Sequence, residues 1–156
     1  MPQPPDRCCC VFTQAITRRR AIIAFGVFVA LLIIIQLLPV FRPDNPPVAA
    51  EPPWDSPETR ALAQRACFDC HSNETVWPWY ARVAPVGWLV VHDVREGRET
   101  FNLSNWHSGD MSGAMAAKEI EEGEMPLPQY LWLHPGARLS DAEKQKLMDG
   151  LRASLK

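Results

Sequence analysis

The sequence predicts an all-α protein, in which a small helical domain follows a single transmembrane helix. Residues 21–38 read AIIAFGVFVALLIIIQLL, an uncharged apolar run whose one polar side chain is Gln36. The part after residue 56 carries helix-capping signals and shows no sustained alternation of apolar and polar residues of the kind that strands need. A chain of 156 residues suffices for one compact domain and an appendage.

Residues 21–38 are the predicted transmembrane helix, since eighteen residues at about 1.5 Å each span about 27 Å of bilayer. Three cations, Arg18–Arg20, precede the run and the next is Arg42, which predicts a short cytoplasmic tail over residues 1–20. A cleaved signal peptide ending at Val48–Ala50 is the main alternative. The uncleaved anchor is favoured because the apolar run is longer than the 7–15 residues usual in signal peptides. A buried core helix is disfavoured, since few are apolar on every side.

The formal charge changes sign along the chain. Residues 1–40 have a net charge of +3, whereas residues 41–156 hold 12 basic and 17 acidic side chains and have a net charge of −5. Nucleic-acid binding needs clustered cations, so the acidic part is not expected to bind nucleic acid. It suits a basic partner protein instead.

The segment between the apolar run and the domain, residues 39–56, is a Pro-rich linker. Seven prolines fall between Pro39 and Pro57, which excludes regular helix and favours polyproline II. The linker is therefore expected to form a semi-stiff stalk that lifts the domain off the membrane. Cys8–Cys10, in the tail, are expected to be reduced thiols, with acylation or metal binding as the alternative.

Capping signals predict four helices in the domain. Ser56 is the expected N-cap of the first, Gly97 the expected stop of the second and Gly123 that of the third. The fourth opens with a capping box at Ser140–Glu143, and Gly150 is expected to weaken its last turn.

The predicted domain, residues 57–156, is small, and small domains often depend on a bound cofactor or a cross-link. Five of the six tryptophans fall in it. Any single one is most simply a core residue, but together they predict walls around something large, flat and apolar. These are Trp77, Trp79, Trp88, Trp106 and Trp132.

The stretch Cys67-Phe68-Asp69-Cys70-His71 is the strongest chemical motif. A structural zinc site needs four ligands, but Cys67 and Cys70 are the only cysteines after the apolar run, and the other histidines lack the spacing of zinc ligands. A thioredoxin-like pair belongs between a strand and a helix, which this sequence does not predict. A plain disulfide leaves His71 without a role.

Covalent haem accounts for the whole motif. Two thiols at this spacing add to the two vinyl groups of a porphyrin, and the histidine that follows binds the iron from the proximal side. The cofactor also supplies the apolar core that the small domain lacks. The motif therefore predicts haem c, with its iron, held by Cys67, Cys70 and His71.

Met125 is the favoured sixth ligand of the iron. The prolines of Pro126-Leu127-Pro128 exclude regular helix and are expected to hold an extended loop that presents the thioether. The alternatives are Met111, Met115, Met148, His92, His107 and His134. Of these, the three methionines are expected to pack in the core, and His134 and His107 come next after Met125.

Three stretches in this order resemble the small haem-binding domain family of bacteria: CFDCHSNETVWPWY, APVGWLVVHDVREGRETFNLSNW and EEGEMPLPQYLWLHPGARLSDAEKQKLMDGL. The resemblance covers residues 57–155. It implies a cytochrome c-like helical fold, with haem attached at Cys67 and Cys70, His71 as proximal ligand and Met125 as distal ligand. It also implies a bacterial protein with a membrane anchor. Together with the position of Arg18–Arg20, this predicts a single-pass protein of the cytoplasmic membrane whose C-terminal domain faces the periplasm.

One-electron transfer to and from a redox partner is the expected function. Iron held by a histidine and a methionine has no open site, and this ligand pair raises the reduction potential. The chain is therefore expected to be a carrier rather than an enzyme. A haem-based sensor or peroxidase-like protein with an open or labile sixth site is the alternative, and a haem with a purely structural role is the third.

Overall fold

The computed structural model describes residues 7–37, 42–107, 109 and 111–156, with side chains from Thr17 onward. The described part consists of helices and loops, and its one β-type pairing is an isolated parallel bridge between Ala50 and Asn105. The predicted all-α fold with one long apolar helix is confirmed.

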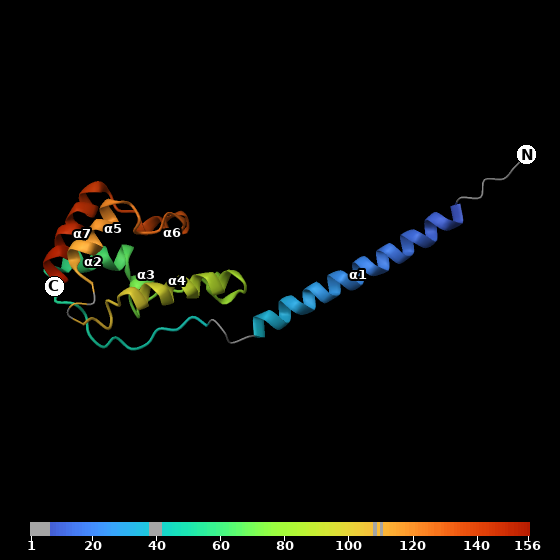
Figure 1. The fold of residues 1–156 in the computed structure, drawn as a ribbon, viewed down its shortest axis with the longest axis horizontal. Helices are drawn as coiled ribbons and strands as arrows, with labels where there is room; N and C mark the ends of the chain where they lie inside the picture. Colours follow the sequence, from blue (N-terminus) through green and yellow to red (C-terminus); the bar gives the residue numbers. More distant parts are fainter. Residues whose placement is uncertain (1–6, 38–41, 108, 110) are drawn as a thin grey trace, which may run out of the picture.

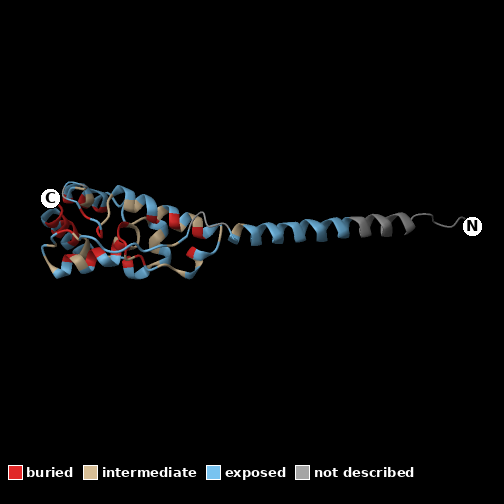
Figure 2. Cartoon of the chain, turned by 90° about the horizontal axis from the view of Figure 1, so that it is seen from below, coloured by how far each residue is buried: buried red, intermediate tan, exposed pale blue. Residues whose placement is uncertain are grey.

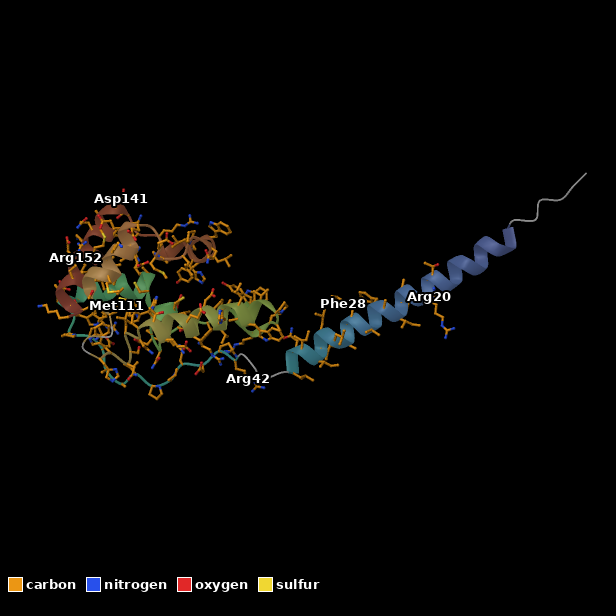
Figure 3. The ribbon with its side chains drawn as sticks, in the orientation of Figure 1. Arg20, Phe28, Arg42, Met111, Asp141 and Arg152 are labelled. Atoms are coloured by element: carbon orange, nitrogen blue, oxygen red, sulfur yellow. The ribbon has the colours of Figure 1, made fainter. Side chains whose placement is uncertain are left out.

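The first helix, α1, runs from Arg7 to Leu37 and extends away from the rest of the molecule (Figure 1). Its segment Thr17–Leu37 is long and apolar enough to cross a membrane, and none of it is buried by the protein. Figure 3 shows Phe28 on this isolated helix. The helix begins well before the predicted span at residue 21. Residues 38–41, and the side chains of Cys8–Cys10, lie outside the described residues.

Three helices form the core of the domain: α2 (Pro57–Ala66), α5 (Gly113–Glu121) and α7 (Asp141–Ser154). Both α2 and α5 pack against α7, and the buried residues gather in the domain (Figure 2). The buried apolar side chains of this core form one cluster, which includes Leu62, Ala63, Phe68, Ala117, Ile120, Leu147 and Leu151. Apolar burial on these three amphipathic helices supplies most of their stability, because isolated helices of this length are marginal in water.

The predicted caps of α2 and α7 are present. Ser56 accepts a hydrogen bond from the Thr59 amide, and Ser140 and Glu143 form the reciprocal capping box. Gly150 lies at a close contact between α7 and α2, a role that its low helix propensity does not indicate. A Cβ there would lie 2.5 Å from Cγ2 of Thr59 and closer still to its hydroxyl, so the glycine lets α7 approach α2.

A second group of elements extends from this core toward α1: α3 (Phe68–His71), the 3₁₀ helix η1 (Trp79–Arg82) and α4 (Val86–Thr100). The prediction that Gly97 ends its helix is wrong. α4 continues to Thr100, and the Phe101 amide caps it by donating to the carbonyl of Gly97.

Two short elements follow α5: α6 (Pro128–Leu133) and the 3₁₀ helix η2 (Pro135–Ala137). The extended loop predicted after Met125 is therefore shorter than expected. Pro128 opens α6 at the first helical position, where a missing N–H removes no helical hydrogen bond.

The described part of the linker lies against the domain instead of forming a free stalk. The Ala49 amide donates to the Ser104 carbonyl over 2.8 Å, and the Trp106 amide donates to the Ala50 carbonyl over 3.0 Å. Farther toward α1, the Asn73 side chain donates to the Pro47 carbonyl over 2.9 Å. An extended proline-rich backbone keeps its carbonyls unpaired, so neighbouring donors can bind it.

Arg98 of α4 fastens the same segment. Its guanidinium donates to the Asp44 carbonyl and to the Asn45 side chain. It also donates to the Ser72 carbonyl over 2.7 Å and to the Thr75 hydroxyl over 2.9 Å. One largely buried cation thus joins the linker, α4 and the chain after α3.

Candidate functional site

A cavity of about 690 Å³ opens between the α3–α4 side of the domain and the side formed by α5, α6 and α7. This volume falls within the roughly 300–1,000 Å³ usual for small-molecule sites. Its wall is mainly aliphatic, from Leu103, Ile120, Leu127, Leu131, Leu139, Leu147 and Leu151. Such a wall excludes water and suits a large apolar ligand.

Both cysteines of the motif line this cavity. The Cys67 amide donates to the Ala63 carbonyl at the end of α2, and the amides of Cys70 and His71 donate back to the Cys67 carbonyl. This tight turn brings the two side chains to one wall. The thiols are free.

Desolvation keeps both thiols protonated at neutral pH. Burial, followed by the nearby Cys70, raises the pKa of Cys67 to about 12. Burial, with the carboxylates of Asp69 and Asp93, raises the pKa of Cys70 to about 11. Zinc binds thiolates, and no group of three or more potential ligands is found among the described histidines, cysteines and carboxylates.

His71 is buried beside the cysteines, and its ring is fixed on two sides. Its Nδ1 lies 2.9 Å from the carbonyl of Gly97, and the ring stacks on Phe101 with centroids 4.1 Å apart. A carbonyl only accepts, so Nδ1 carries the proton and Nε2 keeps its lone pair for a metal. Burial lowers the pKa of His71, which favours the neutral ring that a metal requires.

Gly97 makes this arrangement sterically feasible. A Cβ on Gly97 would lie 2.5 Å from the carbonyl oxygen of Cys70 and 3.1 Å from the Cβ of Cys70. Any larger residue would move α4 away from the motif. The glycine therefore brings its own carbonyl within reach of His71.

Met125 lines the same cavity as the motif, with 37% of its surface exposed. The amides of Glu124 and Met125 both donate to the Glu119 carbonyl, which folds this segment back on the end of α5. The four residues predicted for the site, Cys67, Cys70, His71 and Met125, thus come together on one cavity.

The other sulfur and nitrogen candidates divide into two groups. Met111 and Met115 also line the cavity, and Met115 is 58% exposed, so its predicted place in the core is wrong. Met148 is in the core as predicted. Among the described cavity-lining residues there is no histidine besides His71, and His134 instead stacks on Tyr130.

The prediction that tryptophans wall the site is wrong. No tryptophan is among the described residues that line the cavity. Trp106 is buried in the core, whereas Trp79 and Trp132 are each more than 70% exposed. Leucines, methionines, Phe101 and Tyr130 take the expected place.

Tyr130 and Asp69 form a contact that the sequence analysis missed. The Tyr130 hydroxyl donates to Oδ2 of Asp69 over 2.6 Å, and burial, aided by this hydrogen bond, raises the pKa of Tyr130. Two cations, Arg138 and Lys144, also line the cavity and could face the acidic groups of a ligand. The position of Asp69 inside the motif was the one sequence signal for this contact.

An iron porphyrin fits the residues of this cavity. It would use the aliphatic wall for its macrocycle, Nε2 of His71 and a thioether for its iron, and the two thiols for attachment. The fold and the site therefore define a helical haem-binding protein.

Comparison with known proteins agrees with this class. The model of the haem-binding domain family matches residues 30–153, and the chain belongs to that family. The match begins inside α1 and so includes the end of the apolar helix and the linker. Searches of curated proteins and of solved structures give no match.

Proposed function

We propose that the protein is a membrane-anchored c-type haem protein that transfers single electrons. In this proposal Cys67 and Cys70 bind the haem covalently, His71 is the proximal ligand and Met125 the distal one. The observation that carries the proposal is the shared cavity, on which two thiols, a histidine with an available Nε2 and a thioether converge.

Bound haem supplies a one-electron iron couple, whose potential the protein tunes through the axial ligands and their surroundings. The residues of this chain orient and shield it. The Gly97 carbonyl holds the His71 ring, which increases the basicity of Nε2. The leucines of the wall keep water from the site. With Met125 as a second ligand beside His71, the iron would favour its reduced state and would have no position for a substrate.

The proposed location is the bacterial cytoplasmic membrane, with α1 as a single span and the domain on the periplasmic side. The exposed apolar surface of α1 supports a membrane span, and Arg18–Arg20, which precede the apolar run within this helix, support the orientation. The net charge of −5 after residue 40 suits a basic redox partner.

Removal of both attachment thiols tests the haem assignment. Full-length protein carrying Cys67→Ala and Cys70→Ala is expected to lose the haem stain on a denaturing gel, while the parent retains it. The matched control replaces Cys8, Cys9 and Cys10 by alanine and is expected to keep the stain. Covalent haem in the first variant would refute the proposal.

A reporter fused after Lys156 tests the topology. It is expected to be active on the periplasmic side, and the fusion is expected to sediment with membranes. A soluble mature form that begins near Glu51 would establish the signal-peptide alternative.

A high-spin ferric spectrum of the parent protein would favour the sensor or peroxidase-like alternative with an open sixth site.

A further inference from the structure

The end of the domain nearest α1 carries an exposed apolar surface, which we call the η1 tip: Trp79, Val83, Val86 and Leu89. Their exposed fractions are 78%, 41%, 52% and 62%. Val86 and Leu89 lie one turn apart on α4, whereas Gly87 and Val91 face inward. Figure 1 shows this end of the domain beside the C-terminal end of α1. Grouped apolar exposure of this kind marks an interaction surface.

Hydrogen bonds join the tip to α1. The Gln36 side chain donates to the Ala84 carbonyl over 3.2 Å and accepts from the Ala84 amide over 3.1 Å. Gln36 is the polar residue of the apolar run and stands one residue before the end of α1 at Leu37. Ala84, between Val83 and Val86, therefore lies level with the end of the helix.

Two arginines stand at the same level. Arg42 and Arg82 line a small cleft of about 270 Å³ that also includes Gln36 and Ala84, and Figure 3 shows Arg42 beside the end of α1. Neither arginine forms an ion pair with another described residue. Guanidinium groups bind phosphate oxygens well, and they are attracted to anionic membrane surfaces.

We infer that the η1 tip docks onto the outer surface of the bilayer that α1 crosses. Trp79, Val83, Val86 and Leu89 enter the interfacial region, and Arg42 and Arg82 face lipid phosphates. This inference rests on the proposed transmembrane role of α1.

Continuity with the anchor favours lipid over a protein partner. A loop hydrogen-bonded to the last turn of a membrane-spanning helix lies at the membrane surface, and tryptophan is enriched there because its ring is apolar and its N–H is polar. Apolar side chains of interfacial segments enter about 5–10 Å into the boundary between headgroups and acyl chains. A membrane surface is thus already in contact with the tip whenever α1 is inserted.

Docking would set the height of the haem cavity above the membrane. α4 begins in the tip at Val86 and carries Gly97, the hydrogen-bond partner of His71, eleven residues later. At about 1.5 Å per residue this is about 16 Å along the helix. The tip and the site are therefore two ends of one rigid element.

Cleavage between anchor and domain tests the docking. The full haem-loaded chain, with a protease site inserted between residues 40 and 41, is reconstituted in phosphatidylcholine–phosphatidylglycerol vesicles and then cleaved. The haem absorbance that floats with the vesicles reports the bound domain. We expect most of it to remain bound after cleavage, including at high salt, because apolar contacts are not screened.

Matched double variants identify the surface. Trp79→Ser with Leu89→Ser is expected to lower the vesicle partition coefficient of the cleaved domain by roughly tenfold or more, because two large apolar side chains leave the interface. The control, Trp132→Ser with Leu133→Ser, removes an equally exposed tryptophan and leucine from α6 and is expected to leave partition unchanged.

Each outcome separates docking from anchoring. Uncleaved protein that fails to float would overturn the proposed anchor. Floating of the uncleaved chain, with complete release of the cleaved parent domain, would overturn docking alone. If both double variants stay bound to the vesicles after cleavage, the contact lies on another surface and the inference is overturned. If binding depends on dimers detected by cross-linking, the tip contacts a second copy of the chain, which also overturns it.

Discussion

The hydroxyl of Tyr130 donates a hydrogen bond to the carboxylate of Asp69 over 2.6 Å. This contact joins the two sides of the cavity, since Asp69 lies between the motif cysteines and Tyr130 lies in α6. The other carboxylate oxygen accepts from the Val76 amide over 2.9 Å, so Asp69 is also held from its own side. The contact therefore fixes α6, and the Met125 segment before it, relative to the turn that carries Cys67 and Cys70.

Loss of this hydrogen bond is expected to loosen the proposed distal ligand. A bond to a charged acceptor contributes about 1.5–3 kcal/mol when buried, and a smaller share is expected here because Tyr130 is only partly buried. Tyr130→Phe should therefore increase the affinity of ferric haem for imidazole by roughly tenfold. Absorbance titration measures this affinity. Tyr80→Phe, at the other tyrosine of the chain, is the control, and equal affinities in the two variants would contradict the tether.

Met125→Ala is expected to give a high-spin ferric spectrum and to admit exogenous ligands, because the sixth position opens. Met125→His should keep six-coordination and lower the reduction potential, since a second nitrogen ligand stabilises ferric iron relative to a thioether. Redox-titrated absorption spectroscopy measures both effects. Met115→Ala removes another thioether of the same cavity and should change neither. The reverse result would identify Met115 as the ligand.

Gly97→Ala is expected to destabilise the domain by about 1–3 kcal/mol, the usual cost of an added methyl group in a packed contact. The new Cβ would lie 2.5 Å from the Cys70 carbonyl oxygen, so α4 must move and weaken its bond to His71. Chemical denaturation followed by tryptophan fluorescence measures the loss. Gly136→Ala is the matched control, since a Cβ there meets nothing within 4 Å. Equal stability of the two variants would show that the contact at Gly97 relaxes without cost.

The capping box of α7 predicts acid sensitivity. The Ser140 amide, followed by Arg65 and the Ser140 hydroxyl, lowers the pKa of Glu143 from 4.5 to about 2. Unfolding therefore takes up a proton between these values, so this stabilisation is complete above about pH 4.5 and is lost as the pH falls toward 2.

Thermal unfolding between pH 6 and pH 3 measures this dependence. Glu143→Gln is expected to reduce the slope of melting temperature against pH in that range. Glu99→Gln, at an exposed glutamate near the end of α4, is the control for a simple change of net charge. An unchanged slope in the Glu143 variant would assign the acid sensitivity to other groups.

Local patterns were the reliable part of the sequence prediction. The capping box at Ser140–Glu143 involves neighbours within one turn, and the apolar run before Leu37 needs only composition, so both were found. The number of tryptophans suggests that large apolar side chains are buried, but it does not show where they lie. The expectation that they form the cavity wall is therefore wrong. The Tyr130–Asp69 bond spans 61 residues, and no periodicity reports such a contact.

Glycines show the same limit. From the low helix propensity of glycine, the sequence predicts that Gly97 ends its helix and that Gly150 weakens the last turn of its own. In the structure each lies where two segments cross too closely for a side chain, with Cys70 in one case and Thr59 in the other. A close crossing depends on tertiary packing, so the sequence alone does not distinguish it from a helix end.

The contact between Arg98 and the linker affects how the domain encounters a redox partner. Free in polyproline II, the seven residues from Asp44 to Ala50 would add about 22 Å of reach, and the domain would search a volume around its anchor. When these seven residues are bound to the domain, they add no reach. In the proposed topology the haem then keeps a constant height and travels with the diffusion of α1 in the plane of the membrane. Encounter with a membrane-bound partner becomes a two-dimensional search, in which lateral density rather than linker length sets the rate.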